Sequence, residues 1–205
     1  PELIDTSAET FGDQQALLDG EIDWSFIQLR AEIHRAAKAL ITTGVQSGDK
    51  VAIWAPNTWE WVVAALGVHV VGAILVPINT RFKGREAAYV LRQAEVNILF
   101  TVTDFLDTNY VNLLQEVEAD QELDEIVVLR GSAQKSTTPF IDFLERADDC
   151  LEAEFLQRKK SVSGDDLCHI MFTSGTTGAP KGAMLGHSAI VRGYNDWADI
   201  IGLEQ

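Results

Sequence analysis

The apolar residues of this chain follow two patterns, one typical of helices and one typical of buried strands. From Ser25 to Gly44 apolar residues recur at helical spacing, and Ser25 with Gln28 forms a capping-box pair. Gly44 is suited to end that helix. Short, mainly apolar runs typical of strands follow at 50–55, 73–78, 96–102, 125–130 and 167–172.

Helical patterns separate these runs. One helix is predicted to start near Thr58, where Asn57 and Glu60 form an N-cap pair. Further helices are predicted over 84–94, 105–119 and 186–202. An N-terminal hairpin is predicted around the Asp19-Gly20 turn, and the polar stretch 130–139 is interpreted as a loop. A second polar stretch, 157–166, introduces the next strand, and its first four residues are interpreted as a solvated face.

Continuously apolar strands that alternate with helices are covered on both faces, as in parallel sheets. The expected fold class is therefore α/β, with layered, largely parallel sheets flanked by helices. The apolar run over 61–78 reaches the lower limit for a membrane-spanning helix. Because Gly67, Gly72 and Pro77 interrupt it, we interpret it as a buried helix and a strand, and no transmembrane segment is expected.

The formal net charge of −15 argues against a nucleic-acid partner or an anionic membrane surface, since both require a basic face. It leaves room for a phosphate ligand, because backbone N–H groups bind anions locally. Cys150 and Cys168 are the two cysteines, too few for a disulfide scaffold. We therefore expect a cytoplasmic protein, with no signal peptide at the start of the chain.

The run "FTSGTTGAPKG" at 172–182 directly follows a predicted strand. The carboxyl edge of an open α/β sheet is where such folds bind ligands. Glycines let the backbone approach a ligand closely, while hydroxyl groups and one lysine supply donors and a positive charge. The residues expected to hold the phosphates of a nucleotide are Thr173, Ser174, Gly175, Thr176, Thr177, Gly178 and Lys181.

Two common nucleotide motifs do not fit this run. A Walker A loop needs Gly-Lys-Ser/Thr, whereas here Pro180 precedes Lys181 and Gly182 follows it. The dinucleotide pattern G-x-G-x-x-G does not occur in the chain either. The sequence therefore supports neither a P-loop kinase nor a dehydrogenase.

Metal and nucleophile chemistry is not expected in this chain. Cys168 and His169 are neighbours on a predicted strand, so their side chains should point to opposite faces of the sheet as core residues. The four histidines are scattered along the sequence, and we expect no metal site. His187 has two open interpretations, a residue near the active site or a solvent-facing residue at a helix start.

The run "IMFTSGTTGAPKG" resembles the signature loop of the adenylate-forming enzymes, which include acyl-CoA synthetases, luciferases and peptide-synthetase adenylation domains. The resemblance extends over nearly the whole chain. The stretch "VAIWAPNTWEWVVAALGVHVVGAILVPINTRF" is most similar to bacterial fatty-acid and steroid-side-chain CoA ligases, and "GAMLGHSAIV" also stands in the expected order. The resemblance thus implies an N-terminal fragment: residues 1–205 would be the first part of the large AMP-binding domain, without the small C-terminal domain.

The family's chemistry would then be that of an AMP-forming ligase in lipid metabolism. ATP and a carboxylic acid, fatty or steroid-derived, would give an acyl-adenylate and pyrophosphate, and CoA would take the acyl group. The loop would hold the β- and γ-phosphates, with Mg²⁺ on their oxygens. The family's metal-linked Glu, ribose-binding Asp and catalytic Lys would lie beyond Gln205, so the fragment is expected to be inactive.

Two alternatives remain open at this point. One is an adenylation domain that loads a carrier protein instead of CoA. The other is a non-catalytic nucleotide-binding module that kept the loop.

Overall fold

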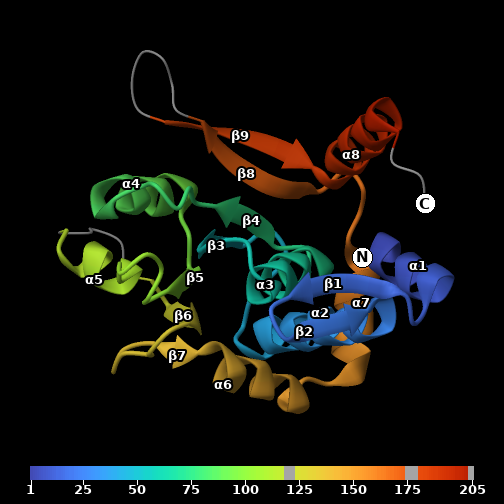
Figure 1. Cartoon of the computed structure of the whole chain (residues 1–205), viewed down its shortest axis with the longest axis horizontal. Coiled ribbons are helices and arrows are strands. Elements are labelled where there is room, and N and C mark those ends of the chain that lie inside the picture. The colour runs from blue at the N-terminus through green and yellow to red at the C-terminus, as the bar shows by residue number, and fades with distance from the viewer. Residues whose placement is uncertain (118–122, 174–179, 203–205) are drawn as a thin grey trace.

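The computed structural model describes residues 1–117, 123–173 and 180–202, and within them the main sheet has seven strands (Figure 1). The strand order is β7-β6-β5-β3-β4-β8-β9, and every neighbouring pair is parallel except the antiparallel pair β8–β9. The expected α/β class with a largely parallel sheet is therefore confirmed.

The strands, including the separate two-stranded hairpin β1–β2, have the following bounds: β1 Gln15–Asp19, β2 Ile22–Ser25, β3 Lys50–Trp54, β4 Ile74–Pro77, β5 Ile98–Val102, β6 Glu125–Arg130, β7 Thr138–Pro139, β8 Leu167–Thr173 and β9 Lys181–Gly186. The helices are α1 Glu2–Phe11, α2 Phe26–Thr42, α3 Trp59–Val70, α4 Gly84–Ala94, α5 Tyr110–Gln115, α6 Phe140–Glu145, the 3-10 turn η1 Arg146–Asp149, α7 Glu152–Ser161 and α8 His187–Ile201.

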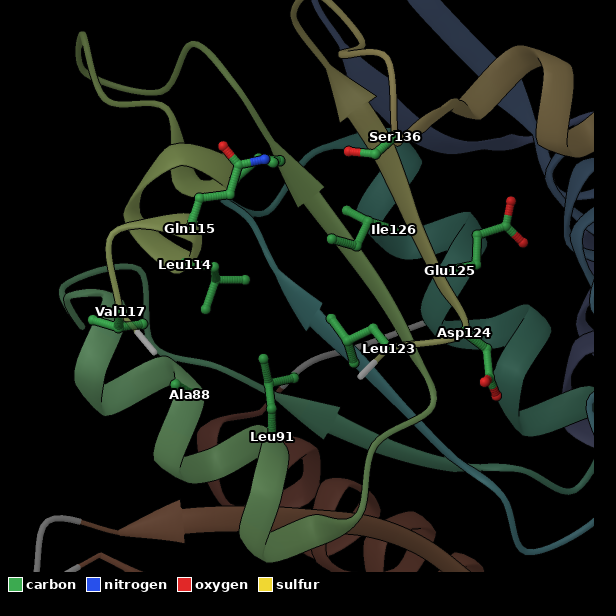
Figure 2. A pocket seen from close by; sticks show the side chains of 11 residues that line it. Ala88, Leu91, Leu114, Gln115, Val117, Leu123, Asp124, Glu125, Ile126 and Ser136 are labelled. Atoms are coloured by element: carbon green, nitrogen blue, oxygen red, sulfur yellow. The ribbon is translucent and has the colours of Figure 1, made fainter. Parts of the chain in front are cut away.

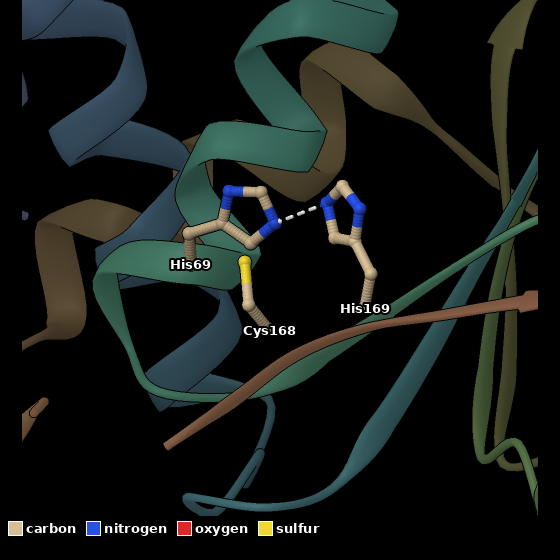
Figure 3. A group of neighbouring side chains, drawn as sticks. All are labelled: His69, Cys168 and His169. Carbon is tan, nitrogen blue, oxygen red and sulfur yellow. Dashed lines mark hydrogen bonds between the residues drawn. The ribbon is translucent and has the colours of Figure 1, made fainter. Parts of the chain in front are cut away.

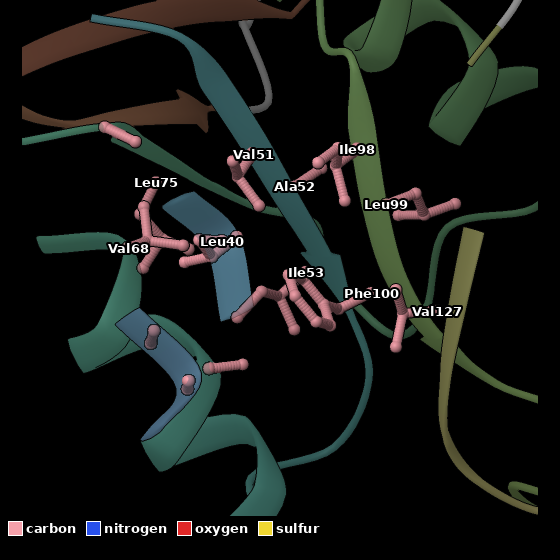
Figure 4. Close-up of a cluster of buried hydrophobic side chains, with 14 of the residues drawn as sticks. Leu40, Val51, Ala52, Ile53, Val68, Leu75, Ile98, Leu99, Phe100 and Val127 are labelled. Carbon is pink, nitrogen blue, oxygen red and sulfur yellow. The ribbon is translucent and has the colours of Figure 1, made fainter. Parts of the chain in front are cut away.

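The core lies around the central strand β3, which pairs with β4 on one side and with β5 on the other. Figure 4 shows apolar side chains of these strands meeting Leu40 of α2 and Val68 of α3. Residues 51–54 and the whole of β5 are buried. The continuous apolar runs in the sequence predicted strands that are covered on both faces, and helices do cover both faces here.

The local helix signals were correct for α2 and nearly so for α3. The Ser25 hydroxyl accepts from the Gln28 N–H, and the Gln28 side chain accepts from the Ser25 N–H, so the capping box is confirmed. Helix α3 starts where expected, but its cap is the Thr58 hydroxyl, which accepts from the Trp61 N–H. The prediction that Asn57 caps this helix with Glu60 is wrong.

Two segments differ from their predictions, and a third agrees. Of the helix expected over 105–119, the described residues form a helix only over Tyr110–Gln115, since Leu106 and Asp107 take left-handed dihedrals and Asn109 caps the start. The polar stretch 157–166, for which no helix was predicted, is helical through Ser161. The apolar run over 61–78 divides into a helix and a strand as predicted. Within the described residues, no helix is long and apolar enough to span a membrane.

A partly buried ion cluster joins the N-terminal hairpin, α3 and β6. The Arg130 guanidinium donates to both Glu60 carboxylate oxygens, with Nε–Oε distances of 2.7 and 2.9 Å, and to Asp19 at 2.5 Å. The Glu60 side chain is only 7% exposed, so its charge depends on Arg130 for compensation. The pKa of Asp19 is lowered, first by the Trp59 N–H and then by Arg130.

Candidate nucleotide-binding site

The signature loop connects two antiparallel strands at the edge of the sheet. The strand β8 runs parallel to β4, so it ends at the carboxyl edge of the parallel strands, where such sheets bind ligands. Thr173 ends β8 and pairs with Lys181, which begins β9. The two residues stand side by side at the base of the loop, and the hairpin is seen along the edge of the molecule in Figure 1.

The structure thus brings together the two ends of the predicted phosphate site. Thr173 and Lys181 are both exposed, and Lys181 makes no ion pair with any residue that the structure describes. The Thr173 hydroxyl lies 3.5 Å from the Lys181 carbonyl oxygen. The other predicted phosphate ligands lie outside the described residues: Ser174, Gly175, Thr176, Thr177 and Gly178.

Two further residues shape the base of the loop, and sequence reasoning missed both. The Tyr89 hydroxyl, on α4, donates to the Pro180 carbonyl oxygen at 3.2 Å, although 91 residues separate them. Gly182 packs so closely that an added Cβ would lie 2.7 Å from Ile170 and 3.3 Å from the Phe172 ring. Only the glycine in the Pro-Lys-Gly end of the motif could have drawn attention to the second contact.

We expect Tyr89→Phe to raise the Michaelis constant of the full-length protein for ATP about fivefold. The variant loses the hydrogen bond that holds Pro180, and such a bond contributes about 1 kcal/mol. Steady-state kinetics at saturating acid would measure this. Tyr110→Phe is the matched control, because it removes a similar bond, from its hydroxyl to the Thr80 carbonyl at 2.8 Å. An equal rise in the control would show that general stability, not the loop base, is responsible.

His187 does not lie next to the loop. It begins α8, at the far end of β9 from Lys181, about 20 Å away for six extended residues. It does not simply face solvent either, because its Nε2 is buried and has no hydrogen-bond partner within the described part of the chain. Burial lowers its pKa. The proposed place of His187 near the active site stays a prediction.

The structure gathers three of the four histidines, contrary to the expectation that they are scattered. His69 on α3 and His169 on β8 approach to 2.9 Å between their Nε2 atoms, and the His187 ring lies 5.6 Å from the His69 ring. Burial is the main cause that lowers the pKa of His69, to about 3, with the neighbouring histidines adding to it. Burial also lowers the pKa of His169.

Cys168 joins the same group, which corrects a second expectation. The ladder between β8 and β9 shifts by one residue between Leu167 and His169, as in a β-bulge. The bulge breaks the alternation of side chains, so Cys168 and His169 do not point to opposite sides (Figure 3). Burial raises the pKa of the Cys168 thiol to about 11.

A separate cavity of about 390 Å³ opens between α4, α5 and β6 (Figure 2). Leu91, Leu114 and Leu123 line its apolar wall, and Asp124 lies at one side. Residues 118–122, which join two of its walls, lie outside the described residues. We therefore assign no ligand to this cavity.

Comparisons with known proteins agree with the family resemblance that the loop indicated. The sequence profile of the AMP-binding enzyme family matches residues 4–204. A Rhodococcus jostii CoA ligase, named for a 7a-methyl-1,5-dioxo-octahydro-1H-inden-4-yl propanoyl group, is 38% identical over 97% of this chain and 39% of its own length. A mitochondrial medium-chain acyl-CoA ligase of Rattus norvegicus is 31% identical over 95% of this chain and 34% of its own.

Solved structures agree as well. An anthranilate CoA ligase in complex with anthranoyl-AMP has a TM-score of 0.78 at 27% identity, over 91% of this chain and 34% of that one. The N-terminal domain of a Mycobacterium tuberculosis protein, FACL13, has a TM-score of 0.77 at 23% identity, over 97% and 46%, which shows the shared fold. This chain thus spans less than half of each relative named here, and about 34–39% of the two curated ones. It belongs to the AMP-binding enzyme family, and the two curated relatives named above are a CoA ligase and an acyl-CoA ligase.

Proposed function

We propose that the full-length protein containing this chain activates a hydrophobic carboxylic acid as its acyl-adenylate and transfers the acyl group to CoA. The observation that carries the proposal is the signature loop at the carboxyl end of β8, in a chain that matches the family from residue 4 to residue 204. The named substrates of the two relatives, a bicyclic propanoyl group and medium-chain acyl groups, favour a fatty or fused-ring acid.

The chemistry follows from the poor reactivity of a carboxylate as an acyl donor. Its oxygen attacks the α-phosphorus of ATP, the bond to the β-phosphate oxygen breaks, and pyrophosphate leaves with the bonding electrons. Negative charge builds up on the departing phosphates, so donors and cations must meet them. Mg²⁺, a hard cation that favours phosphate oxygens, would neutralise part of that charge.

In this proposal the residues at the loop base have separate tasks. Lys181 places an ammonium group beside the β- and γ-phosphates, and the Thr173 hydroxyl donates to a phosphate oxygen. Tyr89 holds Pro180, and Gly182 lets β9 pack against Phe172. The contacts on both sides of Lys181 therefore fix the position of its backbone. The metal-linked Glu, the ribose-binding Asp and the catalytic Lys of the family would come from the rest of the protein.

The test is acid-dependent exchange of labelled pyrophosphate into ATP by the full-length protein. The panel holds straight-chain fatty acids of increasing length, fused-ring acids with a propanoate side chain, and benzoic acids. We expect exchange with at least one acid of the first two classes, and thioester formation on addition of CoA. Exchange that proceeds to a thioester only with a carrier-protein thiol would favour the carrier-loading alternative. A folded protein that is silent across the panel would favour a non-catalytic nucleotide-binding module.

A further inference from the structure

We propose that His69, Cys168 and His169 form a zinc-binding site that ties α3 to β8, the strand leading into the signature loop. The proposed ligase chemistry gives these three side chains no task. They come from segments about 100 residues apart, and the structure places them in one partly buried group (Figure 3).

The geometry is close to that of a metal site. One ligand atom from each of the three residues lies within 4.8 Å of the other two, and the two histidine Nε2 atoms are 2.9 Å apart. In a tetrahedral zinc site, two histidine nitrogens lie about 3.3 Å apart and a nitrogen and a sulfur about 3.6 Å apart. Side-chain rotations that move these atoms by about 1 Å would therefore bring all three around one ion.

The chemistry of the ligands selects zinc. Imidazole nitrogens and a thiolate suit Zn²⁺, whereas Mg²⁺ and Ca²⁺ require oxygen ligands. A metal binds the neutral form of an imidazole, and burial lowers the pKa of both histidines, which favours that form. The Cys168 thiol is protonated without metal, so binding releases one proton to solvent and leaves a zinc–thiolate bond.

His187 is a candidate for the fourth ligand, and a neighbouring cavity offers a route of entry. His187 lies beside His69, and its buried Nε2 has no hydrogen-bond partner among the described residues, so a ring rotation makes it available. A cavity of about 400 Å³ borders all four side chains and is lined on its other sides by apolar residues such as Trp61 and Ile190. An ion can therefore reach the group without opening the core.

The location suggests what such a site would do. The ladder that joins β8 to the parallel sheet contains a single paired position, Leu75 with His169. A zinc ion shared by His69 and β8 would add a second connection close to that position. The strand that carries Thr173 would then be held from both the sheet and α3, which would fix the origin of the loop.

The experiment is a titration of metal-free, full-length protein with Co²⁺, followed by competition with Zn²⁺. We expect one Co²⁺ per chain with the intense visible bands of tetrahedral cobalt and a thiolate-to-cobalt charge-transfer band, both removed by Zn²⁺. Cys168→Ala should abolish the charge-transfer band. His69→Gln should weaken Co²⁺ binding about tenfold or more. Neither readout depends on ligase activity, so the outcome stands apart from the proposed function.

Cys150→Ala is the matched control, since Cys150 is the other cysteine of this chain and lies after η1, away from the group. It should leave both bands unchanged. Circular dichroism checks that each variant is folded, and the His69→Gln result stands alone should Cys168→Ala fail to fold. The absence of tetrahedral bands in the unaltered protein would overturn the proposal, as would a charge-transfer band that survives Cys168→Ala. The two histidines would then be a neutral pair, one donating and the other accepting.

Discussion

Lys181→Ala should slow the adenylation half-reaction of the full-length protein about thirtyfold and leave the thiolysis half-reaction nearly unchanged. Lys181 is exposed at the start of β9 and makes no ion pair with a described residue, so its charge is free for the phosphates. Losing one charge-assisted contact costs about 2 kcal/mol. Because the phosphates leave as pyrophosphate in the first half-reaction, the loss should appear in pyrophosphate exchange.

The second half-reaction provides the discriminating measurement. Single-turnover thiolysis of a preformed acyl-adenylate by CoA should keep its rate in Lys181→Ala. Lys135→Ala is a suitable control, because Lys135 is an exposed lysine in the loop before β7 and should leave both rates unaltered. If thiolysis falls as far as adenylation, Lys181 does not act on the phosphates.

For the central strands of the sheet, the sequence itself indicates that they are buried. Residues 51–54, β5 apart from Thr101, and most of β6 are apolar because helices cover both faces of the central sheet. The sequence of β9 has no apolar pattern that indicates a strand. Its sequence "KGAMLG" has two glycines and one charge, and it is a strand because it pairs with β8 at six positions. That information lies in the tertiary structure.

The candidate sites also differ in how far the sequence predicts them. The phosphate loop could be predicted because its residues are contiguous and its strand precedes it. Tyr89 could not, because its contact with Pro180 depends on how α4 packs beside the hairpin. The group of His69, Cys168 and His169 depends on a bulge in β8 and on a helix about 100 residues earlier. In a regular strand the side chains of neighbouring residues point to opposite faces, but this alternation fails where a bulge adds one residue to the strand.

Arg130→Ala should have the largest effect on stability, about 3 kcal/mol of unfolding free energy, or more than a hundredfold in the folding equilibrium. The Arg130 guanidinium is the partner of Glu60, whose carboxylate is 7% exposed, and it also holds Asp19. Removing it leaves the Glu60 charge buried and uncompensated. This loss of unfolding free energy lies at the low end of the values for breaking a buried ion pair. The reason is that the Arg130 side chain is 39% exposed, so water reaches the vacated space. Urea denaturation of the full-length protein, followed by circular dichroism, measures the change.

A second substitution separates loss of a charge partner from loss of packing. Glu60→Gln combined with Arg130→Ala removes both charges, so the double variant should regain about half of the lost stability. Arg35→Ala serves as the control, because Arg35 forms a half-exposed pair with Glu32 at 3.8 Å, with neither carboxylate nor guanidinium buried, and such pairs contribute about 0.5 kcal/mol or less. If the double variant is no more stable than Arg130→Ala, the guanidinium stabilises the protein by filling space between β6 and α3, and the charge of Glu60 does not need it.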